Sequence, residues 1–382
     1  MTSPDRGADQ PRQGARVERP GASAGGAEER RERLRSLLGL DPTTTEGRLA
    51  AVPSAPSDDG PVEVQLLAPC GEPGAEPGAD PDVIPAFLLR PAPEHDTGAG
   101  VVLVAGHGRG IDALVATDPA DESHDALAHK LARAGLTVLC PEMISFGRRR
   151  VPPPPGGAPW APEEKTCEID AARHLLHGRP VIGRRVADAR AAVQAARALP
   201  GVDPERVAVA GGSGEGRSPC LLAAADETIS AALVATYFCT FQASLASIRH
   251  CPCNIVPGLL PELEMADIAA LIAPRPLVIE AGERDPLFPI IATREAFSLL
   301  PPVWEARGAV PPELVVTRAG MPSAPSAPST LFSSASPAEG AAVGRRAAEI
   351  SLGRGMRRER ASAGRPGHRP RPSAAPVAPL SE

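Results

Sequence analysis

The chain has 382 residues, of which 42% are hydrophobic and only 3% aromatic, so it is long enough for one large domain with loosely structured ends. The formal net charge of −6 argues against a general affinity for nucleic acid or for anionic membranes. The first residues lack the apolar stretch of a secretory signal, and no segment approaches the roughly 18 apolar residues of a membrane-spanning helix. We therefore expect a soluble, cytoplasmic protein.

The chain begins with a polar, Gly- and Pro-rich segment at residues 1–26, which we expect to be disordered. An amphipathic helix is predicted over 27–39, and a long helix over 179–199. A third, Ala-rich helix is expected near 125–134, and residues 151–162 read as an irregular loop. Predicted strands lie at 62–67, 83–89, 100–106, 136–140, 207–210, 231–236, 276–281 and 313–317.

Most of these strands are continuous apolar runs, the pattern of strands that are buried on both faces of a parallel sheet. Buried strands that alternate with helices predict an α/β domain with a mostly parallel central sheet and helices on both faces. We place this domain at residues 27–318 and a low-complexity, disordered tail at 319–382. Ligands of such sheets bind beyond the carboxyl ends of the strands.

A glycine-rich turn, Gly-Gly-Ser-Gly-Glu-Gly, follows the strand at 207–210 and precedes a helical stretch. A serine on a sharp strand-to-helix turn is the setting of a nucleophile elbow, and Ser213 is our candidate nucleophile. The backbone N–H of Gly214 is a candidate donor to an oxyanion. The fifth residue of the usual G-x-S-x-G pattern is Glu215 here, and a plain turn with an idle serine is the alternative.

Two further segments occupy matching positions. His-Gly-Arg-Gly at 107–110 follows the strand at 100–106, where Gly108 and Arg109 are candidates to supply a second oxyanion N–H from the backbone. Asp285 follows the strand at 276–281 and is our candidate for the acid that orients a catalytic base. An Asp-Pro turn is the alternative for this position, and Glu283 is a competitor for the acid.

The segments 107–110, 135–149, 202–216, 235–260 and 272–290 resemble, in order and spacing, α/β-hydrolases of the dienelactone-hydrolase and acetyl-xylan-esterase type. The resemblance implies an α/β-hydrolase fold and a carboxylic-ester or related acyl hydrolase that acts on a small molecule and needs no cofactor. It also implies a catalytic histidine within about 315–330, where this chain has none. His250 and His368 are the candidates left for the base.

The missing histidine leaves two interpretations. The composition changes abruptly near residue 318, which fits a frameshift in the coding sequence; natural truncation to an inactive binding protein with the same fold is the alternative.

The seven cysteines are odd in number and scattered, which favours reduced thiols over a disulfide framework. Cys251 and Cys253 are separated by one residue, so a metal site with Cys239 and His250 is a further alternative. Our main expectation is that no metal is bound.

Overall fold

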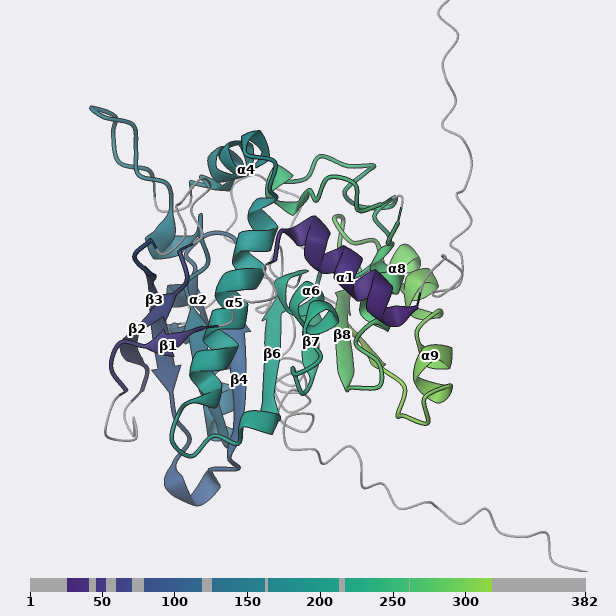
Figure 1. The fold of residues 1–382 in the computed structure, drawn as a ribbon, viewed down its shortest axis with the longest axis horizontal. Coiled ribbons are helices and arrows are strands. Elements are labelled where there is room, and N and C mark those ends of the chain that lie inside the picture. Colours follow the sequence, from purple (N-terminus) through teal and green to yellow (C-terminus); the bar gives the residue numbers. More distant parts are fainter. Residues whose placement is uncertain are drawn as a thin grey trace, which may run out of the picture.

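The computed structural model (Figure 1) describes residues 26–40, 46–52, 60–70, 79–118, 126–161, 164–212, 217–260 and 262–317. Apart from Gly26, the two expected tails lie outside these residues. The described chain forms a nine-stranded sheet of order β1-β2-β3-β5-β4-β6-β7-β8-β9. Strands β1, β2, β3 and β5 pair antiparallel in that order, and the remaining pairs are parallel.

All eight expected strands are present, and the two-residue β1 is additional. The mostly parallel α/β sheet predicted from the sequence is therefore confirmed. The strands are β1 Arg48–Leu49, β2 Val62–Ala68, β3 Asp82–Leu89, β4 Ala99–Val104, β5 Leu136–Pro141, β6 Val207–Gly212, β7 Ala232–Ala235, β8 Leu277–Gly282 and β9 Glu313–Thr317.

The helices follow the expected alternation with the strands, but several are shorter or unexpected. The helix predicted at 179–199 begins later because Pro180 occupies its N-cap position, and the helix predicted at 125–134 is described from residue 127. No helix of the described residues is long and apolar enough to cross a membrane. The α-helices are α1 Ala27–Leu38, α2 Ile111–Val115, α3 Leu127–Arg133, α4 Cys167–Leu176, α5 Val181–Arg197, α6 Arg217–Ala225, α7 Met265–Ala270, α8 Ile290–Phe297 and α9 Pro301–Glu305.

The sheet separates two apolar layers, because successive side chains of a strand point to opposite faces. Val102 and Val104 of β4 belong to the larger layer, which includes side chains of α1, α5 and α6. Val101 and Leu103 belong to the smaller layer, which α2 and α3 complete. Figure 1 shows α1, α5 and α6 on the same side of the sheet.

The larger layer depends on a close crossing of α1 and α5. A Cβ added to Gly183 would lie 1.8 Å from the backbone oxygen of Leu38, so only glycine permits this approach. Leu34 and Leu38 of α1 are fully buried against the layer, as their spacing predicts. Helix α1 is thus an integral part of the domain.

Candidate active site

The parallel strands bring the predicted site segments to one edge of the sheet. Val104 of β4 pairs with Gly211 of β6, and Ala235 of β7 pairs with Glu280 of β8. The loops that follow these strands therefore begin side by side at their carboxyl ends. The His107 loop follows β4 at this edge, the segment with Ser213 follows β6, and the Asp285 loop follows β8.

Ser213 lies in the segment between β6 and α6. Ser213 and Gly214 lie outside the described residues, but the strand before them and the helix after them are both present. Pro219 is the third residue of α6 and lies in its first turn, where a missing backbone N–H costs no helical hydrogen bond. A strand before the Ser213 segment and a helix after it are present as the sequence predicts, whereas the elbow itself and the roles of Ser213 and Gly214 stay predictions.

The loop after β4 is shaped by two glycines with positive φ. Gly108 has a φ of 111° and Gly110 a φ of 64°, values that disfavour other residues. The carbonyl oxygen of Gly108 accepts the N–H of Gly147 at 3.0 Å, which ties this loop to the loop after β5. The N–H of Gly108 meets no acceptor among the described residues. Gly108 and Arg109 thus lie where the sequence predicts backbone donors.

Glu142, which directly follows β5, accepts a hydrogen bond from each of these two loops. Its Oε2 accepts the N–H of Ile111 at 3.4 Å and the N–H of Arg148 at 3.1 Å. A Cβ on Gly110 would lie 2.2 Å from Oε1 of Glu142, and a Cβ on Gly147 would lie 2.2 Å from Oε2. Burial raises the pKa of Glu142 to about 7, against the opposing effect of the two N–H donors.

Asp285 lies in the loop after β8 and is almost completely buried. Its Oδ1 accepts the backbone N–H of Leu287 at 2.8 Å and that of Phe288 at 3.1 Å. Its Oδ2 is buried and has no hydrogen-bond partner among the described residues. Burial raises the pKa of Asp285. Glu283, the competitor for the acid, is exposed to solvent.

His250 lies near this loop, because its ring packs edge-on against Phe288 with the centroids 5.6 Å apart. Burial lowers the pKa of His250 and so favours the neutral ring. The amide Nδ2 of Asn254 lies 3.2 Å from Nδ1 of His250. The Nε2 of His250 is buried and has no hydrogen-bond partner among the described residues. His368 lies outside the described residues.

Three further buried charged or ionisable groups near this edge were not among the predicted site residues. Glu142 and Glu280 are almost completely buried, and burial raises the pKa of Glu280 to about 7. Arg217, the first residue of α6, is fully buried. Its guanidinium carbon lies 5.8 Å from the ring centroid of Tyr237. Its guanidinium nitrogens have no hydrogen-bond partner among the described residues. An acidic residue directly after an apolar strand was the available signal for Glu142.

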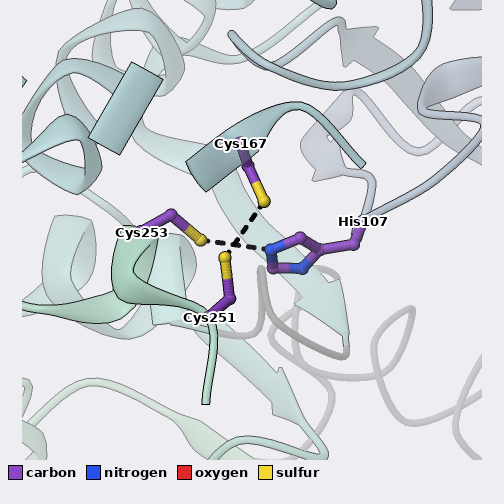
Figure 2. A group of neighbouring side chains, drawn as sticks. All are labelled: His107, Cys167, Cys251 and Cys253. Atoms are coloured by element: carbon purple, nitrogen blue, oxygen red, sulfur yellow. Dashed lines mark hydrogen bonds between the residues drawn. The ribbon is translucent and has the colours of Figure 1, made fainter. Parts of the chain in front are cut away.

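Four metal-ligating side chains meet beside the His107 loop (Figure 2). His107, Cys167, Cys251 and Cys253 each offer one ligand atom, and these atoms lie within 4.8 Å of one another. Cys239 and His250, which the sequence grouped with Cys251 and Cys253, do not belong to this cluster. Cys239 is buried instead beside Thr240, whose carbonyl oxygen accepts its Sγ–H at 3.1 Å.

The nine-stranded, mostly parallel sheet and the helices that alternate with its strands define an α/β-hydrolase fold. The family model of the dienelactone hydrolases matches residues 84–297, more than half of the chain. The chain belongs to the dienelactone hydrolase family. A comparison with the sequences of curated proteins finds no match.

Solved structures share the fold at low sequence identity. A Bacteroides fragilis protein assigned as an acetyl xylan esterase has a TM-score of 0.58 at 12% identity, covering 77% of this chain and 74% of its own. The glucuronoyl esterase of Teredinibacter turnerae has a TM-score of 0.53 at 14% identity, with coverages of 87% and 86%. That of Solibacter usitatus has a TM-score of 0.52 at 14% identity, with coverages of 76% and 87%.

Proposed function

We propose that this protein hydrolyses the carboxylic ester, or a related acyl bond, of a small molecule through Ser213. Ser213 attacks the acyl carbonyl, and the backbone N–H groups of Gly214 and of the 108–109 loop bind the oxyanion. Asp285 orients the base, and water then releases the acyl group from the serine. Membership of the dienelactone hydrolase family supports this class of reaction.

The observation that carries the proposal is the unequal environment of the two Asp285 oxygens. In a catalytic triad, backbone groups hold the acid while one oxygen accepts the Nδ1–H of the histidine. Backbone N–H groups hold Oδ1 of Asp285, whereas Oδ2 is buried without a partner in the described chain. A buried oxygen that lacks a donor costs free energy, which a function at this position explains.

The same oxygen motivates a second candidate function, a binding protein that has kept the fold without the reaction. No histidine of the described residues donates a hydrogen bond to Asp285. His368 is the only histidine of the sequence beyond residue 317. A protein without a base retains the cleft and the oxyanion donors but loses most of its rate.

Labelling with a fluorophosphonate probe separates the two candidates, because the probe reacts only with an activated serine. We expect the full-length protein to be labelled and the Ser213→Ala variant to be inert. Ser298→Ala is the matched control, because Ser298 is an exposed serine at the C-cap of α8. Its labelling should equal that of the wild type.

Asp285→Asn and His250→Gln then test the groups behind the serine. The first should slow labelling by about 10³-fold or more, the loss expected when a base is no longer held in its tautomer. A comparable loss in His250→Gln would assign His250 as the base. A folded wild-type protein that is not labelled would reject the hydrolase and leave the binding protein.

A further inference from the structure

Three segments that are far apart in the sequence build the cluster in Figure 2. His107 comes from the loop after β4, Cys167 is the first residue of α4, and Cys251 and Cys253 flank Pro252 in a short 3-10 turn. The Nε2 of His107 lies 3.1 Å from Sγ of Cys253, and the Sγ atoms of Cys167 and Cys251 lie 3.0 Å apart. The four side chains face a common centre in Figure 2.

We propose that His107, Cys167, Cys251 and Cys253 bind one zinc ion that has a structural role. Three thiolates and one imidazole form a Cys₃His set, which suits tetrahedral Zn²⁺. Zinc bonds of about 2.3 Å to sulfur and about 2.0 Å to nitrogen separate tetrahedral ligand atoms by about 3.5–3.8 Å. The ligand atoms lie within 4.8 Å of one another, and shifts of up to about half an ångström for each atom bring them to these separations.

The four side chains differ in their exposure to solvent. Cys167 and Cys253 are almost completely inaccessible to solvent, whereas His107 and Cys251 are partly exposed and leave an entry path for the ion. The amide Nδ2 of Asn254 lies 3.7 Å from Sγ of Cys253, where it can donate to a metal-bound thiolate.

Positive charge next to the cluster fits three thiolates and one Zn²⁺, which together carry a charge of −1. The fully buried guanidinium of Arg185 lies 4.1 Å from the ring centroid of Phe146. The same ring packs against His107 at 4.6 Å between centroids. Arg185 thus supplies a compensating charge in a part of the protein that water does not reach.

The proposed site goes beyond hydrolysis, because the ion supplies no group to the reaction. All four coordination positions belong to the protein, so the ion has no open position for a substrate or a catalytic water. Its effect is to fasten the His107–Gly110 loop to α4 and to the turn at Cys253.

The first test measures the metal content of the full-length, untagged protein, purified with a phosphine reductant and without chelators. We expect about one zinc ion per chain by mass spectrometry of the elements, since such sites bind zinc tightly at neutral pH. Cys167→Ser and Cys251→Ser should lose the zinc. Cys70→Ser is the matched control, because Cys70 is partly exposed like Cys251 and lies outside the cluster; it should retain the metal.

Reconstitution of the wild type keeps the test valid if a variant does not fold. After removal of zinc by a chelator, added Co²⁺ should give the intense visible absorption of tetrahedral thiolate coordination, and added Zn²⁺ should abolish it and raise the melting temperature. A reduced, folded wild type that takes up neither ion would overturn the proposal. So would zinc that persists in both serine variants, or a Cys167–Cys251 disulfide in a protein that binds no metal once reduced.

Discussion

The buried carboxyl group of Glu142 makes the stability of the loops around the candidate active site depend on pH. We consider the substitution Glu142→Gln, which keeps an acceptor oxygen for the N–H groups of Ile111 and Arg148 but cannot ionise. Burial raises the pKa of Glu142 from 4.5 to about 7 in the folded protein. Between these two pH values the folded state therefore still holds a proton that the unfolded state has already released.

The size of the effect follows from the difference between the two pKa values. The stabilisation from the raised pKa is complete below pH 4.5 and is lost as the pH rises through about 7. Each unit of pKa corresponds to about 1.4 kcal/mol, so the whole loss is about 3 kcal/mol, of which about 2 kcal/mol falls between about pH 5.5 and about pH 8.5. The Gln variant lacks this loss, so its stability relative to the wild type should improve by about 2 kcal/mol over that interval.

Urea unfolding at the two pH values, followed by circular dichroism, measures this change directly. Glu295→Gln is the matched control, since Glu295 is exposed on α8, and its effect should be the same at both pH values. If Glu142→Gln changes the free energy of unfolding equally at both pH values, the carboxyl group does not titrate between them and the reasoning is refuted. A relative loss of stability in the variant at the higher pH would contradict the sign.

Three further experiments test other contacts. Gly110→Ala and Gly98→Ala both place alanine at positive φ, but the first also brings a Cβ within 2.2 Å of Glu142, whereas the second meets no atom nearer than 3.6 Å. The first should lose about 1–3 kcal/mol more in urea unfolding; equal losses would argue against the contact. Glu280→Gln should repeat the pH pattern of Glu142→Gln, because burial raises the pKa of Glu280 to about 7; a pH-independent effect would contradict it. Trp304→Ala should cost about 3–5 kcal/mol, since its ring is fully buried, and a calorimetric loss below about 1 kcal/mol would contradict this packing.

The sheet could be predicted because a strand buried on both faces carries apolar residues without interruption. The runs at 100–106 and 136–140 are of this kind, and both are strands of the structure. Helix α9 was missed because it begins with Pro301 and Pro302, which interrupt a helical pattern but are tolerated in a first turn. Helix α4 follows a proline-rich loop and is only ten residues long.

The site was predicted only as far as single segments reveal it. A strand followed by Gly, Ser or Asp marks a position at the carboxyl edge, which is how Asp285 and the 107–110 loop were found. The thiol cluster depends on three segments that no local spacing connects, so the sequence grouped Cys251 with Cys239 and His250 instead of Cys167 and His107. Proximity along the chain is a poor guide where tertiary contacts choose the ligands.

Two different interactions fix the loop after β4, a hydrogen bond to a buried carboxylate and the contact of His107 with three thiols. Glu142 binds the N–H of Ile111 beneath the loop, and His107 joins the thiols of Cys167, Cys251 and Cys253 beside it. A loop that must direct a backbone N–H at a developing charge gains from such fixation, because donors that are already oriented need not reorganise during the reaction. On this argument, removal of the proposed zinc should lower the rate of probe labelling at Ser213 without changing the fold of the sheet. Unchanged labelling in the metal-free protein would show that the zinc site does not affect the reactivity of Ser213.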